Sequence, residues 1–213
     1  MAMCDEVPRT YAHPLPPPGY LSRFAEVSYT KKELPHWECS GVAAFITLRL
    51  GDSLPEDRLG PWRKMLDEWK AAHPEPWDRE TEMEYARLYR GEIEKWLDQG
   101  FGAAVFSDPV NRAVVEEALH YYDGKRYALY SFVVMPNHVH LLMMPTDGNT
   151  IASIMRLFKH YVSTKLAAVQ SWEGKFWQNE YWDALIRNER HFMAVRRYIK
   201  SNSPAIAYDA YER

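Results

Sequence analysis

Apolar residues alternate with other positions along several short stretches of this chain, at the spacing of two that a β-strand requires. The alternation is clear over residues 42–50, where one face of the strand would carry Val42, Ala44, Ile46, Leu48 and Leu50. The same reasoning predicts strands over 127–134, 138–144 and 182–186, and a short strand over 103–106. Only Met135, Pro136 and Asn137 separate the stretches 127–134 and 138–144. These two are therefore predicted to form an antiparallel hairpin.

Apolar residues three and four positions apart predict helices over 110–122, 151–170 and 188–202. Asp108 and Pro109 supply an N-cap and a first-turn proline for the first helix, and Thr150 is expected to cap the second. Pro204 is expected to end the third, because proline cannot continue a helix. The apolar stripe of the second helix is predicted to be buried: Ile151, Ile154, Met155, Phe158, Val162, Leu166 and Val169.

The order of these elements predicts an α+β fold, with an antiparallel sheet and helices packed against one of its faces. Residues 1–35 are rich in proline and are interpreted as an extended N-terminal arm. Residues 36–213 are predicted to form a single domain. A helical insertion of about residues 52–100 interrupts this domain after the first strand, with one helix starting at Pro61 and a second over 80–99.

Composition favours a packed globular protein, since 46% of the 213 residues are apolar. No apolar run approaches the roughly 20 residues that span a bilayer, and the N-terminus lacks the pattern of a signal peptide. The two cysteines, Cys4 and Cys39, form no metal-binding pair, so a reducing cytoplasm is the expected location. The net charge of −3 is unevenly spread: residues 120–213 hold 12 Lys and Arg against 8 Asp and Glu, which leaves 14 against 21 before them. The basic part is compatible with local phosphate binding.

The insertion carries four tryptophans, Trp62, Trp69, Trp77 and Trp96, which raises the question of a base-stacking surface. Aromatic residues at helical spacing are more often packing residues. The insertion also holds 13 acidic and 8 basic residues, which makes it a poor phosphate binder. Packing between the inserted helices is therefore the preferred interpretation.

His138 and His140 are the most informative residues for chemistry. In a strand they point to one side together with Leu142 and Met144, while Val139, Leu141 and Met143 point to the other. Two neighbouring imidazoles on a rigid strand provide two of the ligands that a divalent metal needs. The alternative interpretation is a pair of ordinary half-buried strand histidines.

The segments around these residues resemble the HUH single-tyrosine transposases, and in particular the REP-associated branch. The resemblance is carried by Met135 to Leu142 with its His-hydrophobic-His core, by Phe176 to Arg187, and by the helix that contains Tyr198 to Asn202. Residues 34–37 and 44–49 resemble the opening of that branch. The resemblance covers roughly residues 34–207. It implies a ferredoxin-like or RRM-like sheet with the histidines on a central strand.

The resemblance also implies an activity. Tyr198 would be the nucleophile of a metal-dependent single-stranded DNA endonuclease and strand transferase, forming a 5′-phosphotyrosine. His138 and His140, with the oxygen of Asn202 as third ligand, would hold Mg²⁺ or Mn²⁺. The substrate would be single-stranded DNA with hairpin-forming repeats. A monomer is favoured, with a homodimer as the alternative, in a bacterial cytoplasm near the nucleoid.

Two departures from the family pattern concern Asn202. The family helix usually ends in Asn-Pro, whereas here Ser203 separates Asn202 from Pro204. The commoner relatives have glutamine at this ligand position, and the shorter asparagine reaches less far. His138 and His140 are therefore expected to hold most of the metal.

Basic residues near the predicted site are candidate DNA contacts. They lie on the helix 151–170 and around the tyrosine helix: Arg156, Lys159, Lys165, Arg187, Arg196 and Arg197. Two other functions remain open. One is a domesticated protein that binds hairpin DNA without cleaving it, and the other is a zinc hydrolase that recruits His120 or His160 as a third ligand.

Overall fold

The computed structural model describes residues 15–22, 24–31, 35–54, 56–74, 76–146, 148–167, 174–203 and 205–212. The strands are β1 (Ser28–Lys31), β2 (Pro35–Glu38), β3 (Ala44–Arg49), β4 (Tyr127–Met135), β5 (His138–Pro145), β6 (Trp182–Leu185) and β7 (Tyr208–Asp209). The α-helices are α1 (Glu56–Ala72), α2 (Arg79–Asp98), α3 (Pro109–Tyr122), α4 (Ile151–Ala167) and α5 (Glu189–Asn202), and η1 (Val105–Ser107) is a 3₁₀ turn. No helix in this part of the chain is long and apolar enough to cross a membrane.

The main sheet is antiparallel and has the strand order β6-β3-β5-β4-β7. The path β3-α3-β4-β5-α4-β6 through its first four strands is the ferredoxin-like arrangement. The predicted α+β class and the β4–β5 hairpin are therefore confirmed. β5, which carries His138 and His140, lies in the middle of the sheet between β3 and β4.

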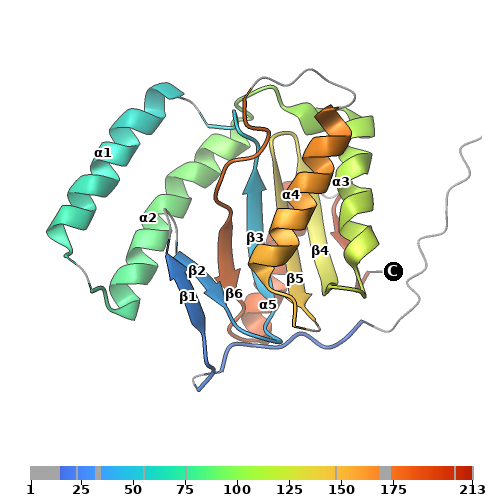
Figure 1. The fold of residues 1–213 in the computed structure, drawn as a ribbon, viewed down its shortest axis with the longest axis horizontal. Coiled ribbons are helices and arrows are strands. Elements are labelled where there is room, and N and C mark those ends of the chain that lie inside the picture. Colours follow the sequence, from blue (N-terminus) through green and yellow to red (C-terminus); the bar gives the residue numbers. More distant parts are fainter. Residues whose placement is uncertain are drawn as a thin grey trace, which may run out of the picture.

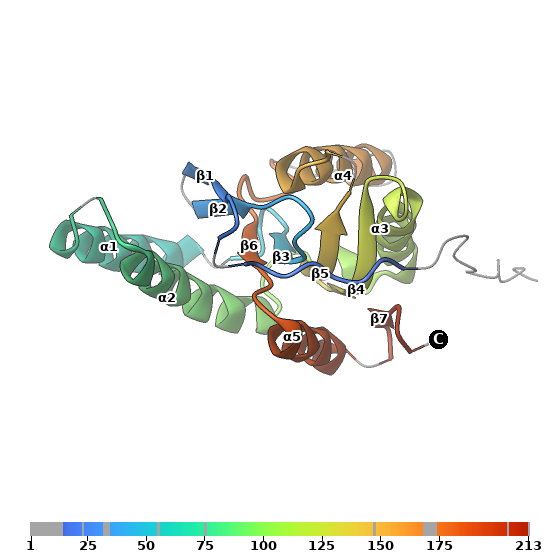
Figure 2. The ribbon, with the colours of Figure 1, turned by 90° about the horizontal axis from the view of Figure 1, so that it is seen from below.

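Helices cover both faces of this sheet, which corrects the expectation that they pack against one face. Helices α3 and α4 lie on one face, and α5 lies on the other (Figure 2). The buried residues of α4 belong to one hydrophobic cluster, whereas Phe192, Val195 and Ile199 of α5 belong to a second. The apolar stripe of α5 shows in the sequence, but a stripe does not specify which face of a sheet it covers.

Helices α1 and α2 form the predicted insertion after β3 and extend away from the sheet at the side of β6 (Figure 1). They pack on each other through a separate apolar cluster that includes Trp62, Leu66, Tyr85 and Trp96. Trp69 and Trp77 are partly buried against it. The packing interpretation of the tryptophans is thus confirmed. Helix α1 begins at Glu56, so Pro61 lies inside it rather than at its start.

Two short segments differ from the predictions. Residues 103–106 were predicted as a strand, but Val105 and Phe106 belong to the turn η1, and Ala104, just before it, has a φ of 49°. Strand β1 lies within what was interpreted as an extended arm, and it pairs antiparallel with β2, which begins at the last residue of that arm. Residues 1–14 of that arm lie outside the described residues. Residues 15–22 form no helix or strand, and Gly19 and Leu21 bond to the backbones of Ala43 and Ile186.

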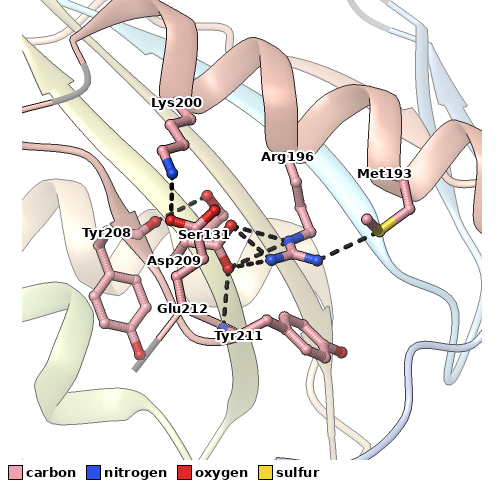
Figure 3. A network of polar contacts seen from close by, with 8 residues as sticks. All are labelled: Ser131, Met193, Arg196, Lys200, Tyr208, Asp209, Tyr211 and Glu212. Atoms are coloured by element: carbon pink, nitrogen blue, oxygen red, sulfur yellow. Dashed lines mark hydrogen bonds and ion pairs between the residues drawn. The ribbon is translucent and has the colours of Figure 1, made fainter.

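The C-terminal segment returns to the sheet and holds α5 in place (Figure 3). β7 pairs with β4 at Ser131 and Phe132, and Ser131 Oγ donates to the Tyr208 carbonyl at 2.8 Å. Arg196 of α5 donates from Nε and Nη2 to both carboxylate oxygens of Asp209 at 2.7 to 3.2 Å. Such a two-pronged pair with both side chains buried fixes α5 relative to β7.

Candidate active site

Strand β5 places the two histidines on the sheet face that α5 covers. Leu142 and Met144 belong to the cluster that contains the α5 residues, whereas Val139 and Leu141 belong to the cluster under α3 and α4. The alternation predicted from the sequence is therefore present. Each histidine also faces a polar partner on the neighbouring strand: Arg49 of β3 pairs with His138, and Thr47 pairs with His140.

The two imidazoles approach each other through the equivalent ring atom, Nε2. Nε2 of His138 lies 3.1 Å from Nε2 of His140, with an angle of 75° between the rings. Two nitrogens bound at right angles to one metal ion, each about 2.1 Å from it, lie about 3 Å apart. The spacing and the donor type thus fit two ligands of one divalent ion.

The other ring nitrogen of each histidine is also engaged. Nδ1 of His138 lies 2.8 Å from Oδ1 of Asn137, and Nδ1 of His140 lies 2.9 Å from Oγ1 of Thr47. Metal-binding histidines usually donate this second N–H to an oxygen, which orients the ring. The pair therefore has the surroundings of a metal-binding pair as well as its spacing.

The surroundings of His138 keep its ring neutral. The side chain is 1% exposed, and burial lowers its pKa, with the positive charge of Arg49 acting in the same direction. The resulting pKa is about 3. Because only a neutral imidazole can bind a metal, His138 is in its metal-binding form at physiological pH.

Helix α5 brings Tyr198 to the histidines. Its hydroxyl lies 3.4 Å from Nε2 of His140, and the ring of Phe45 packs edge-on against Tyr198 and in a tilted contact against His140. Asn202 follows one turn later, where its amide donates to the Tyr198 carbonyl at 2.8 Å. The structure thus brings Tyr198, His138 and His140 together, while the hydrogen bond of the Asn202 side chain is made within its own helix.

The predicted DNA contacts are divided between the two sides of the sheet. Arg156, Lys159 and Lys165 belong to α4, on the face opposite the histidines. Arg187 and Arg197 are exposed, just before and on α5. Arg196 and Arg197 are on the same helix as Tyr198.

Two of these cations have specific partners inside the protein. Lys159 donates from Nζ to the carbonyls of Gln178 and Asn179 at 2.9 and 3.2 Å. Arg196 is the clearest departure from the expectation of a DNA contact, because its guanidinium is buried against Asp209 and the Tyr211 ring. Both side chains stabilise local structure in this conformation.

Three residues of this site were not singled out in the sequence: Thr47, Arg49 and Asn137. All three are buried polar residues. Thr47 and Arg49 were visible as polar positions in an apolar strand, and Asn137 directly precedes His138. Their polar character was visible in the sequence, but only the pairing of β3 with β5 shows that Thr47 and Arg49 lie opposite the histidines.

A second buried cluster surrounds His36 on β2. Its Nδ1 lies 2.5 Å from Oδ1 of Asp183, its Nε2 lies 2.9 Å from Oε2 of Glu180, and its ring packs on Tyr181. Burial disfavours the imidazolium, but the hydrogen bonds and charges of the two carboxylates outweigh it and raise the His36 pKa. This cluster joins the β1–β2 hairpin to β6.

Other positions considered for a third ligand lie elsewhere. His120 packs against Phe132 and Tyr208 on the α3 side, and His160 is exposed on α4. Within the described ranges, no group of three or more His, Cys, Asp or Glu side chains is arranged to hold a metal. A cavity of about 730 Å³ lies between α3 and the C-terminal segment, and none of the predicted site residues lines it.

Residues 103–202, which include both histidines, Tyr198 and Asn202, match the family model described as transposase IS200 like. An uncharacterised protein of Haemophilus influenzae is 30% identical over 33% of this chain and 51% of that protein. The chain therefore spans about half the length of this curated relative.

Two solved structures are similar at low identity. One is a REP-associated tyrosine transposase bound to a REP hairpin, with 15% identity, a TM-score of 0.41, and coverage of 82% of this chain and 74% of that chain. The other is a candidate transposase from Deinococcus radiodurans R1, with 13% identity, a TM-score of 0.32, and coverage of 76% and 90%.

Proposed function

Because the chain belongs to the IS200-like transposase family, we propose that it is a metal-dependent single-stranded DNA endonuclease and strand transferase. Tyr198 is the nucleophile in this proposal, and His138 and His140 hold a Mg²⁺ or Mn²⁺ ion. One observation carries it: the Tyr198 hydroxyl lies 3.4 Å from the same Nε2 atom of His140 that faces His138 at 3.1 Å. A nucleophile and a ligand pair thus converge on one point.

In the proposed reaction the Tyr198 oxygen attacks the scissile phosphorus. A bond forms between that oxygen and phosphorus, and the bond from phosphorus to the 3′-oxygen breaks. The phenol loses its proton and the leaving 3′-oxygen gains one, which gives a 5′-phosphotyrosine and a free 3′-hydroxyl. The step is reversible because the phosphodiester is exchanged rather than hydrolysed, so a 3′-hydroxyl can later rejoin the strand.

The residues around the histidines support this chemistry. A divalent ion at the two nitrogens would neutralise a phosphate oxygen and favour loss of the phenolic proton. Arg49, which pairs with His138 across the sheet, adds a positive charge on the same face. Phe45 packs against both Tyr198 and His140 and limits the movement of the tyrosine. The role of Asn202 as a third ligand remains a prediction.

The proposed substrate is single-stranded DNA with a hairpin-forming repeat, as the resemblance to REP-associated transposases implies. Arg187 and Arg197 are proposed to contact its phosphates, since they are exposed near the Tyr198 face. The protein is proposed to act as a monomer in the bacterial cytoplasm.

The test is incubation with a labelled hairpin-bearing single strand and Mn²⁺, followed by denaturing electrophoresis. We expect a covalent protein–DNA adduct with the natural protein and none with Tyr198→Phe, which removes one hydroxyl and little packing area. Tyr161→Phe is the matched control, because Tyr161 is a half-buried tyrosine on α4 at the other face. Binding without adduct by the natural protein would favour the domesticated DNA-binding protein instead, and an adduct with Tyr198→Phe would assign the nucleophile to another tyrosine.

A further inference from the structure

The polar atoms behind the histidine pair form a chain that reaches the helical insertion. Asn137 donates from Nδ2 to the carbonyl of Phe101 at 2.9 Å, and its Oδ1 lies 2.8 Å from Nδ1 of His138. The backbone carbonyl of Asn137 also accepts from the Leu50 amide at 3.0 Å. With its side chain fully buried, Asn137 has one orientation of its amide that satisfies both partners.

This orientation determines which nitrogen of His138 carries the proton. An amide oxygen only accepts hydrogen bonds, so Nδ1 of His138 must be the N–H that donates to Asn137. In the neutral ring, Nε2 then carries the lone pair. His138 is therefore held in the form that a metal ligand needs.

Thr47 plays a different part opposite His140. In the absence of an ion, the contact of 3.1 Å between the two Nε2 atoms needs one proton, and His140 must supply it because Nε2 of His138 has none. Nδ1 of His140 then accepts from the Thr47 hydroxyl. When an ion binds, His140 must carry its proton on Nδ1 instead and donate it to Thr47. A hydroxyl can serve both states, because it can donate or accept.

The base of the insertion supports the Asn137 side of this chain. Phe101 follows α2 and lies between Gly100 and Gly102, which have φ angles of 71° and 91°. The Ala103 amide donates to Oδ2 of Asp52 at 2.7 Å, which closes the two ends of the insertion on each other. A side chain at residue 102 would meet Asp52 at 2.7 Å, so only glycine fits there. The Phe101 carbonyl is thereby held at a fixed place.

We propose that Asn137 and Thr47 are positioning residues that set the tautomers of His138 and His140 for metal binding, and that the insertion supports Asn137 through Phe101. Asn137 holds His138 in one tautomer, and Thr47 allows His140 to change between two. This inference rests on the proposed function, since it concerns the ion that the histidine pair would hold.

The experiment measures Mn²⁺ affinity by calorimetry on the full chain, with each variant checked for folding by circular dichroism. Loss of a partner behind a metal-binding histidine typically weakens metal binding about 10- to 100-fold. We expect a loss of this size for Thr47→Val, which has the same shape without the hydroxyl, and for Asn137→Leu. Thr47→Ser keeps a hydroxyl and should bind almost as the natural protein does. Val139→Ile, whose side chain faces the other cluster, is the second control.

Nitrogen-15 NMR of the histidine rings gives a readout that does not depend on activity. In the metal-free protein we expect His138 protonated on Nδ1 and His140 on Nε2, with His140 changing to Nδ1 when Zn²⁺ is added as a diamagnetic probe. Folded Asn137→Leu should lose the single His138 tautomer. Asp52→Asn, which is remote from both rings, should disturb the single tautomer of His138 less than Asn137→Leu does.

The outcomes separate the two claims. Equal Mn²⁺ affinity in the natural protein, Thr47→Val and Asn137→Leu, or unchanged tautomers in Asn137→Leu, would overturn the positioning roles and leave the proposed function intact. A natural protein that shows the predicted metal-free tautomers but binds no Mn²⁺ and forms no adduct would instead refute the proposed function. If Asn137→Leu does not fold, Thr47→Val against Thr47→Ser still decides the matter for His140.

Discussion

The sheet buries a histidine cluster on each of its faces, and the two clusters have opposite electrostatics. Under α5, His138 and His140 face each other, Arg49 pairs with His138 across the sheet, and the pKa of His138 falls to about 3. At the β6 edge of the other face, His36 lies between two carboxylates, and its pKa rises. Burial alone lowers the pKa of both His138 and His36. The charge of the neighbours therefore decides whether a buried histidine is a neutral ligand or a charged partner.

The two clusters accordingly suit different tasks. The Nε2 atoms of His138 and His140 lie 3.1 Å apart, a spacing that suits two ligands of one cation. The cluster of His36, Glu180 and Asp183 is already satisfied internally, with the Trp37 amide adding a bond of 3.2 Å to Asp183. It joins two parts of the chain that are more than 140 residues apart. The first cluster is the candidate site of the proposed chemistry, and the second joins β2 to β6.

The largest expected effect comes from removing a histidine under α5. His138→Ala and His140→Ala should each reduce the yield of covalent adduct at least about 100-fold, since two ligands become one. Val139→Ile should change it little, because residue 139 faces α3 and α4. Adduct yield at fixed Mn²⁺ measures this. Equal damage from all three variants would contradict the division of the strand into two faces.

Removing a partner at the β6 edge should instead affect stability. Asp183→Asn or His36→Ala leaves a buried charge or polar group without its partner, which typically costs about 3 to 5 kcal/mol of the free energy of unfolding. Urea unfolding measures the loss, while adduct formation by the folded fraction should be retained. The exposed pair Lys64–Glu68 on α1 provides a control, and Lys64→Ala should leave unfolding unchanged. A loss of adduct in folded His36→Ala would contradict the assignment of the His36 cluster to stability alone.

The dependence of stability on pH should show both clusters with opposite signs. The raised pKa of His36 means that its contribution is complete below about pH 6.5, the unfolded value, and is lost as the pH rises through the folded value. The lowered pKa of His138 means that stability falls as the pH drops from about 6.5, because the unfolded state then binds a proton that the folded state does not. The measurement is urea unfolding between pH 5 and 9, at roughly half-unit steps. His36→Gln should flatten the alkaline side of the plot of unfolding free energy against pH, and His138→Asn should flatten its acid side. An unchanged alkaline side in His36→Gln would contradict the imidazolium assignment.

The smallest expected effect concerns DNA binding on the two faces. Replacing Arg187 and Arg197 by alanine should weaken binding to all sequences about equally and reduce the slope of affinity against salt, by about 0.7 for each lost phosphate contact. Arg156→Ala with Lys165→Ala, on the α4 face, should leave the slope unchanged. Fluorescence anisotropy from 50 to 200 mM salt is the measurement. The reverse result would place the DNA on the α4 side.

Local pattern was sufficient for much of this structure. The face shared by His138, His140, Leu142 and Met144 follows from the alternation of a strand, and the start of α3 follows from Asp108 and Pro109. The apolar stripe of α5 was visible for the same reason. In each case the determining residues lie within one or two turns, or within one strand.

Contacts between distant segments could not be predicted in this way. β7 has two residues and carries no strand signal, yet its Asp209 forms a buried ion pair with the guanidinium of Arg196. Lys159 was predicted to be a DNA contact, because nothing in the sequence of α4 shows that its Nζ donates to the carbonyls of Gln178 and Asn179. The placement of α5 on the face opposite α4 likewise depends on the whole sheet. At the site, Thr47 and Asn137 were identifiable as polar residues, but not as partners of particular ring nitrogens.

The short strand β7 has a consequence for how copies of this protein meet one another. An outer strand with free amides and carbonyls is a template for pairing with another chain, and proteins protect such edges. Here β7 pairs with β4 at Ser131 and Phe132, beside the irregularity in the β4–β5 register between Leu129 and Ser131. Another molecule can extend the sheet from this part of β4 only by displacing β7, and with it the carboxylate that Arg196 binds. Pairing of a second copy at this edge would therefore break the ion pair between Arg196 of the tyrosine helix and Asp209.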